Sequence, residues 1–170
     1  MGNINSCWAP QARTPVSTTT TSSVCTTKAT TAAHNFVVKN YSLIKRMGAD
    51  KYVASSRFRV GGYNWCIDFC PGGDARAPGY AAAFLRRCGG AAAMDVMVRY
   101  RLSMREEGGK VHKVGPLWST TFRSRLGSTL YVNIGSLRIA NKSKLRGDCF
   151  IITCDLIVIG TPTVQDCVLL

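Results

Sequence analysis

The chain has 170 residues, of which 22 are Lys or Arg and 9 are Asp or Glu, so its formal net charge is +13. This length suits one domain of ordinary size with its own apolar core. Hydrophobic residues make up 46% of the chain and charged residues 18%, which excludes a disordered polyelectrolyte and a collagen-like polymer. No run of about 18 apolar residues occurs, so we expect no transmembrane helix.

The first part of the chain is rich in hydroxyl residues. Residues 17–23 are all Ser or Thr, and Arg13 is the one charged residue among the first 23. A segment of this composition buries too little apolar surface to offset the entropy lost on ordering, so we predict a flexible leader over residues 1–23. The opening residues lack a basic start followed by an apolar stretch, so they do not resemble a secretory signal.

Eight cysteines are spread along the chain. Because no secretory signal is recognised, we expect their thiols to be reduced. The spacings of Cys66 to Cys70 and of Cys149 to Cys154 do not match the paired ligands of a zinc ribbon, and the two histidines stand apart. We therefore predict no metal site and no cofactor, and we treat most of the cysteines as small buried apolar residues.

From about residue 24 onward, apolar and polar residues alternate with a period of two, which is typical of β-strands. Residues 63–70 alternate in this way and end at the Pro-Gly-Gly of residues 71–73. Residues 95–104 have one apolar and one charged or polar face, as in a half-buried antiparallel strand. In residues 148–159 one face is wholly apolar and the other is mixed, which predicts a central strand. The apolar positions of the three segments are Tyr63, Trp65, Ile67, Phe69, Val96, Val98, Tyr100, Leu102, Met104, Phe150, Ile152, Cys154, Leu156 and Val158.

The remaining segments are shorter and less decided. Residues 81–87 fit either one helical turn or another strand, and residues 136–146 fit a short helix. Glycine pairs interrupt the chain at the spacing that is typical of short strands in a sandwich or barrel. The pairs are at residues 61–62, 89–90 and 108–109. The predicted fold is a mostly antiparallel all-β sandwich over residues 24–160, followed by a short C-terminal tail over residues 161–170.

Catalytic motifs are missing from the sequence. It contains no nucleophile-elbow, phosphate-binding or zinc-protease motif. A hydrolase needs a general base near its nucleophile, usually a histidine, and this chain has two histidines that stand apart. The adjacent acids Glu106 and Glu107 lie at a Gly-flanked turn, where a solvated tip is the expected arrangement. We therefore predict that the chain is not an enzyme.

The positive charge suggests two kinds of partner. A basic domain attracts phosphates, so nucleic-acid binding is one alternative. The basic residues are spread along the chain, however, and pairs such as Arg57 with Arg59 and Arg99 with Arg101 are what the exposed face of a strand requires in any case. An acidic or phosphorylated protein partner is therefore favoured over nucleic acid.

Both ends of the chain match lipidation patterns. Gly2 begins an N-myristoylation pattern, and Cys7 next to it is a candidate palmitoylation site. Cys167 begins a C-terminal prenylation pattern whose last residue, Leu170, favours a geranylgeranyl group. A lipid-anchored peripheral membrane protein is thus a second alternative, and a chance match of short patterns is the other interpretation.

Several segments, in this order, resemble the MATH (meprin and TRAF homology) domain, particularly the MATH-BTB proteins of grasses. The most specific are the Gly-Tyr-x-Trp-x-Ile strand that ends at Pro-x-Gly and the closing D-x-F-x-I-x-C-D-L-x-V-I strand. The matching segments are residues 27–42, 51–60, 61–73, 80–85, 98–111 and 148–159. The resemblance implies an antiparallel TRAF-like β-sandwich of about eight strands.

The resemblance also implies a shallow groove that binds an extended Ser/Thr-rich peptide of a target protein. By position, Tyr80 and Tyr100 correspond to aromatic groove residues, although the period of two also allows a core position for Tyr100. A groove tyrosine of some members falls near Thr120. The Trp-Gly-Phe segment that members carry next is replaced here by residues 127–131, which end at Tyr131. Because aromatic residues dominate interface energies, we expect the usual peptide to bind weakly or not at all.

In full-length members a BTB domain follows the MATH domain and engages a cullin, so that the protein serves as a substrate adaptor of a ubiquitin ligase. The present chain ends at Leu170, where such a domain would begin, so we expect no cullin contact of its own. The expected partners are target proteins with Ser/Thr-rich or acidic segments and full-length MATH-BTB relatives. The expected location is the nucleus or cytoplasm, or a membrane if the lipidation patterns are used.

Overall fold

The computed structural model describes residues 19–48, 51–73, 81–88, 94–106, 108–109, 111–123, 137–139 and 148–167. The chain divides into two compact units. The larger is Thr27–Pro162, and the smaller combines the two ends of the chain, Met1–Thr26 and Thr163–Leu170. Among the described residues, no helix is long and apolar enough to cross a membrane.

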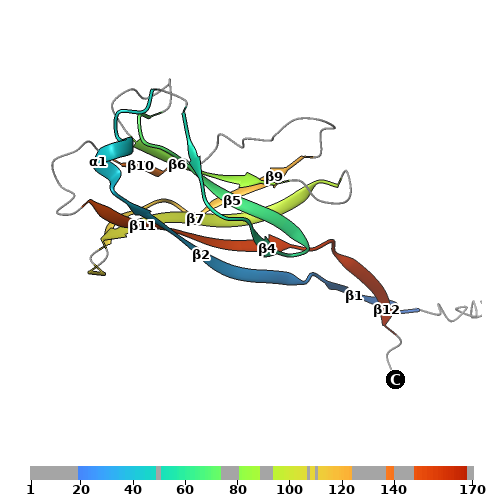
Figure 1. The fold of residues 1–170 in the computed structure, drawn as a ribbon. Helices are drawn as coiled ribbons and strands as arrows, with labels where there is room; N and C mark the ends of the chain where they lie inside the picture. Colours follow the sequence, from blue (N-terminus) through green and yellow to red (C-terminus); the bar gives the residue numbers. More distant parts are fainter. Residues whose placement is uncertain are drawn as a thin grey trace, which may run out of the picture. The chain divides into compact units, whose positions relative to one another are not determined.

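The larger unit contains two antiparallel sheets (Figure 1). The first, called here the β11 sheet, has the strand order β2-β11-β7-β8, with β9 also paired to β7. The second, the β5 sheet, has the order β10-β6-β5-β3, with β4 also paired to β5. Their strands are β2 (Ala29–Lys39), β3 (Val53–Ala54), β4 (Phe58–Val60), β5 (Tyr63–Cys70), β6 (Ala81–Arg87), β7 (Val96–Glu106), β8 (Val111–Val114), β9 (Trp118–Phe122), β10 (Leu137–Ile139) and β11 (Cys149–Ile159), and helix α1 (Tyr41–Ile44) follows β2. The predicted antiparallel all-β sandwich is confirmed.

Strand β11 is the centre of its sheet. It pairs with β2 along all eleven of its residues and with β7 along ten, from Phe150 to Ile159. Its even-numbered residues from Phe150 to Val158 are at most 4% exposed, and its odd-numbered residues are partly or fully exposed. The central strand predicted over residues 148–159 is therefore confirmed, with one face in the core.

The core lies between the facing sides of the two sheets. Aromatic rings contact one another across it in edge-to-face geometry, which favours such pairs beyond the area that they bury. The ring of Phe69 lies 5.4 Å from that of Phe150, and the ring of Trp65 lies 5.0 Å from that of Phe122. The Trp65 indole also donates a hydrogen bond of 3.2 Å to the carbonyl of Val60, so its one polar atom is satisfied.

Segments whose assignment was open are now defined. Residues 81–87 form strand β6 rather than a helical turn, because their backbone pairs with both β5 and β10. Of the helix expected over residues 136–146, the structure describes 137–139, and these form strand β10. The glycine pair at residues 61–62 has positive φ at both positions, +60° and +85°, and forms the tight turn between β4 and β5.

The smaller unit contains a two-stranded antiparallel ribbon of β1 (Ser22–Thr26) and β12 (Thr163–Cys167). Strand β1 includes Ser22 and Ser23, which we assigned to the leader, and β12 occupies much of the predicted tail. Composition describes each segment by itself and does not show that residues 22–26 pair with residues 163–167, which lie far away in the sequence.

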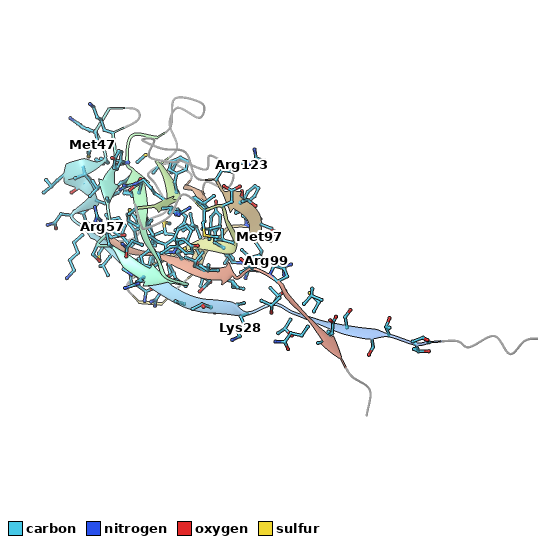
Figure 2. The ribbon with its side chains drawn as sticks, turned by 90° about the vertical axis from the view of Figure 1, so that its right-hand side faces the viewer. Lys28, Met47, Arg57, Met97, Arg99 and Arg123 are labelled. Carbon is cyan, nitrogen blue, oxygen red and sulfur yellow. A yellow bond between two sulfur atoms is a disulfide. The ribbon has the colours of Figure 1, made fainter. Side chains whose placement is uncertain are left out.

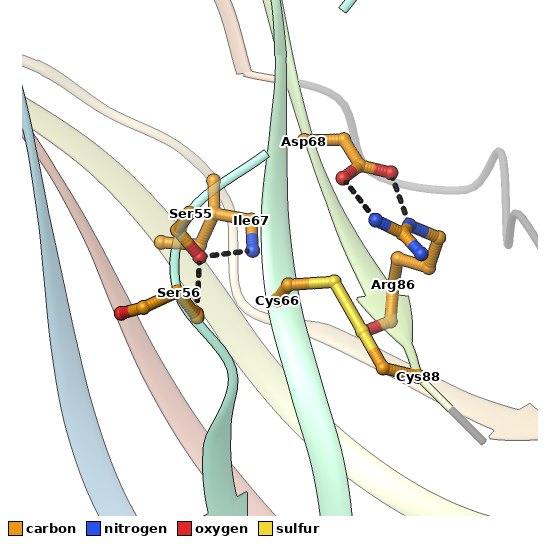
Figure 3. The surroundings of a disulfide bond; sticks show 7 residues. All are labelled: Ser55, Ser56, Cys66, Ile67, Asp68, Arg86 and Cys88. Atoms are coloured by element: carbon orange, nitrogen blue, oxygen red, sulfur yellow. Dashed lines mark hydrogen bonds and ion pairs between the residues drawn. A yellow bond between two sulfur atoms is a disulfide. The ribbon is translucent and has the colours of Figure 1, made fainter. Parts of the chain in front are cut away.

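A disulfide joins Cys66 on β5 to Cys88 just after β6, which corrects the expectation that all eight cysteines are thiols (Figure 3). Cys88 continues the pairing of β6, since its amide donates a 2.8 Å hydrogen bond to the carbonyl of Asn64. This register places the two cysteines diagonally on the same face, with Cα atoms 6.6 Å apart, within the range that a disulfide spans. Residues so far apart in the sequence meet only through the strand register, which the spacing did not reveal.

The same face of the β5 sheet holds a buried ion pair (Figure 3). Asp68 is fully buried, and its two carboxylate oxygens accept hydrogen bonds from Nε and Nη2 of Arg86 at 2.5 and 2.9 Å. The arginine side chain is 17% exposed, and its guanidinium lies 5.7 Å from the ring centroid of Tyr52. Two-point pairing of this kind satisfies both charges and makes Asp68 tolerable inside the protein.

We predict that the disulfide stabilises the domain by about 3 kcal/mol, because it closes a loop between positions 22 residues apart in the unfolded chain. Urea unfolding with and without a reductant measures this. Reductant lowers the unfolding midpoint of the wild type to that of a Cys66→Ala/Cys88→Ala variant, whose own midpoint does not change. The control Cys70→Ala, on the same strand, keeps its sensitivity to reductant. A wild-type midpoint that is indifferent to reductant contradicts the pairing.

The ion pair gives a second prediction for stability. Asp68→Ala leaves the largely buried charge of Arg86 without its carboxylate and lowers the free energy of unfolding by about 3 kcal/mol. The exposed carboxylate of Asp155 is the matched control, and Asp155→Ala changes stability by less than about 0.5 kcal/mol. Asp68→Leu combined with Arg86→Met recovers much of the loss. Equal effects of the two single alanine variants in urea unfolding would show that the pair is unimportant.

Candidate functional site

The predicted groove residues fall into three groups. Tyr80 and Tyr131 lie outside the described residues. Tyr100 lies in the core of the larger unit and Thr120 on strand β9, in the same sheet. Tyr100 and Thr120 are not directly opposite each other, because Tyr100 pairs in register with Trp118 and Thr120 pairs with Val98. The part of the site that the structure defines is therefore strand β9 and its support on β7.

Tyr100 has only 1% of its surface exposed, so the structure gives it the core position that the two-residue period allowed rather than a place on the groove. It lies in register between Leu156 on β11 and Trp118 on β9. Burial raises the pKa of its phenol far above the ordinary value, and the nearby Cys154 adds to the shift. A side chain held in this way contacts the core and is not available to a partner.

Strand β9 lies along β7 at the border of the β11 sheet (Figure 1). Each of its five residues, from Trp118 to Phe122, pairs in register with β7. Within the described ranges, no other strand pairs with it. A border strand presents N–H and C=O groups on its free side, and an extended peptide binds to such groups by adding a strand.

The inner face of β9 passes from core to surface in two-residue steps. Phe122 is fully buried, with its ring against that of Trp65. Thr120 and Trp118 are partly exposed, and Trp118 packs against the core cluster. Leu117, just before the strand, is 52% exposed. The inner face of β9, called here the inner strip, is therefore buried at Phe122 and partly exposed to a partner at Thr120 and Trp118.

An arginine from the other sheet holds the buried end of β9. Nη1 of Arg87 donates hydrogen bonds to the carbonyls of Met94 and Phe122, at 2.9 and 3.5 Å. Its guanidinium also lies 4.7 Å from the ring centroid of Tyr63, close enough for a cation–π interaction. Because Arg87 is tied to Phe122, the end of β9 is linked to the β5 sheet.

An exposed cation adjoins this border. Arg123 follows directly after β9 and is exposed. It lies on the same side of the view in Figure 2 as Met97, away from Met47 and Arg57. The site thus combines backbone groups, the hydroxyls of β9, a part-exposed indole and an exposed guanidinium group, which suit an extended and preferably acidic peptide. Among the described residues, no group of three His, Cys, Asp or Glu side chains converges as a metal site.

Trp118 is the functional candidate that the sequence analysis did not single out. A signal was present, because Trp118, Thr120 and Phe122 alternate with the same period of two that identified the other strands. The family resemblance implies a strand over residues 119–122 with a groove position near Thr120, and Trp118 lies just before that range.

The lipidation of Gly2, Cys7 and Cys167 stays a prediction. Gly2 and Cys7 lie outside the described residues. Cys167 is the last residue of β12 and pairs in register with Ser22 in the smaller unit.

Comparisons with known proteins identify one family and several plant relatives. A family model described as MATH domain matches residues 33–156. The chain is 31% identical over 154 residues to BTB/POZ and MATH domain-containing protein 5 of Arabidopsis thaliana, an alignment that covers 82% of this chain and 36% of the relative. It is 37% identical over 100 residues to BTB/POZ and MATH domain-containing protein 4 of the same plant, covering 56% and 21%. The chain thus spans about a fifth to a third of these relatives.

The graded burial of β9 predicts different costs at two neighbouring inward positions. Phe122→Ala removes a fully buried ring and lowers the free energy of unfolding by about 3–5 kcal/mol. Thr120→Ala, at the part-exposed position, costs about 1 kcal/mol or less. Urea unfolding of the two variants measures the difference. A loss at Thr120 as large as that at Phe122 would mean that Thr120 belongs to the core.

Proposed function

The chain belongs to the MATH domain family, and we propose that it is a protein-binding module that captures an extended segment of a target protein along β9. The observation that carries the proposal is that, within the described ranges, no strand pairs with the side of β9 opposite β7, next to the part-exposed side chains of Trp118 and Thr120. The backbone of β9 supplies hydrogen bonds that any peptide sequence satisfies, and the strip supplies selectivity through side chains that alternate along the peptide.

The resemblance to the MATH part of plant MATH-BTB proteins is confirmed, and the MATH family is a family of protein-interaction modules. We propose that this chain recognises targets as the MATH domain of a ubiquitin-ligase substrate adaptor does. The relatives carry both BTB/POZ and MATH domains in their names, and this chain spans the MATH part of them. Capture of a target needs binding groups and no catalytic ones, which agrees with the expectation that the chain is not an enzyme.

The site has fewer described aromatic residues than the family resemblance implies. Tyr100 is in the core, and Thr120 occupies the position near which some members have a tyrosine. Since Tyr and Trp commonly supply most of the energy at interfaces, we propose that the affinity of β9 for a peptide is limited by the small side chain at position 120.

This proposal predicts a gain of binding. In Thr120→Tyr, an aromatic ring at the part-exposed inner position adds apolar contact, so the affinity for Ser/Thr-rich peptides rises about tenfold, equivalent to about 1.4 kcal/mol. The matched control is Thr121→Tyr, which adds the same ring on the exposed outer side of β9 and leaves affinity within about twofold. Fluorescence anisotropy with a fluorescein-labelled array of Ser/Thr-rich peptides measures both variants.

A gain of function separates binding from folding, because a damaged domain does not bind more tightly. Equal affinities of the wild type, Thr120→Tyr and Thr121→Tyr for every peptide of the array would place peptide binding away from the inner face of β9. Absence of saturable binding by all three proteins would reject the proposed function.

A further inference from the structure

We propose that the outer face of the β11 sheet is a second docking surface, which takes an acidic protein segment whose carboxylates alternate with large apolar residues. The face is formed by the outward residues of β2, β11 and β7, and it is separate from the inner strip of β9. It therefore stands or falls independently of peptide capture along β9.

Strand register assembles this face into rows that cross the three strands. In one row, Thr31, Ile157 and Arg99 lie side by side. The next rows in either direction contain Ile159 beside Met97, and Asp155 beside Arg101. The complete rows are Val37-Ile151-Arg105, Asn35-Thr153-Ser103, Ala33-Asp155-Arg101, Thr31-Ile157-Arg99 and Ala29-Ile159-Met97.

Apolar side chains on this face keep much of their surface in contact with solvent. Val37 is 45% exposed and Met97 is 51% exposed. The outward isoleucines of β11 are only partly buried, although β11 is the central strand of the sheet. Single exposed apolar residues are ordinary, but several that share one face of adjacent strands mark an interaction surface.

The charge on the same face is strongly one-sided. Its outward residues carry four cations, namely Lys39, Arg99, Arg101 and Arg105, and one carboxylate, Asp155. Arg99 and Arg101 are exposed and lie two residues apart on β7, which separates their Cα atoms by about 6.6 Å. A partner with carboxylates at a similar spacing would complement this charge and be guided toward the face.

The arrangement favours a protein over nucleic acid. A phosphate backbone would satisfy the arginines of β7, but it has no apolar surface for the isoleucines of β11, which lie one strand away at about 4.8 Å. An acidic segment with interspersed Leu, Ile or Phe contacts the arginines of β7 and the isoleucines of β11 at once. Exposed ion pairs contribute little energy each, so the isoleucines supply most of the affinity and the arginines supply selectivity.

The test is a selection from a display library of random 16-residue peptides against the full chain. The proposal predicts enrichment of peptides that combine Asp or Glu with Leu, Ile or Phe. In Arg99→Glu/Arg101→Glu, affinity for the synthesised winners falls at least about tenfold, because attraction becomes repulsion. The matched control Arg57→Glu/Arg59→Glu changes the net charge equally at two exposed positions, one just before β4 and one on it, and keeps affinity within about twofold.

Further variants keep the test decisive. If the glutamate variant does not fold, Arg99→Gln/Arg101→Gln removes the attraction without introducing repulsion. Val37→Thr, a nearly isosteric change at an exposed position, lowers affinity by removing apolar contact, whereas Thr120→Tyr does not alter it. A library without acidic winners overturns the proposal, as does an equal loss of affinity in the Arg57/Arg59 control. If a 12-base-pair DNA duplex binds tightly and loses affinity in Arg99→Glu/Arg101→Glu, the face is a nucleic-acid surface and the proposal is wrong.

Discussion

The fold depends on the pairing of β11 with both of its neighbours. Because the inward residues of β11 from Phe150 to Val158 are all apolar, a shift of one residue in either pairing would turn the whole set toward solvent. The register is therefore strongly specified. It fixes β7 against β11, and β7 in turn places Trp118 and Thr120 of β9 next to the core.

The same register separates the two surfaces on which the functional interpretation rests. The inward residues of β9 extend from the core to the border of the sheet and form the first surface. The outward residues of β7 and β11 place arginines beside isoleucines and form the second. Part of the positive charge of the chain lies on this face, where four of its 22 basic residues accompany one carboxylate. In this MATH domain, the proposed peptide site and the proposed docking face lie on strands of one sheet.

Periodicity predicted the fold class and the central strand, since each depends only on which residues alternate, and it allowed the core position of Tyr100 beside the groove position that the family resemblance implied. It did not predict the disulfide between Cys66 and Cys88 or the burial of Asp68, because both depend on the partner strand β6. The alternation over residues 63–70 places the large apolar side chains on one face, yet β5 is buried on both faces from Trp65 to Cys70. Which strand lies at the border of a sheet depends on the strand order, and no local sequence pattern contains that order. The sequence therefore predicted Thr120 as a site residue but not the position of β9 at the border of the sheet.

The most direct test of the account is hydrogen exchange of the β9 amides, measured by NMR with and without a peptide selected for binding at Thr120. In the free chain, the amides of β9 that face β7 should exchange slowly and the alternate ones quickly, while those of β11 should all be slow. The bound peptide should slow the fast amides of β9. If all five β9 amides are already slow in the free chain, or if the peptide protects another strand, β9 is not the open border at which targets bind.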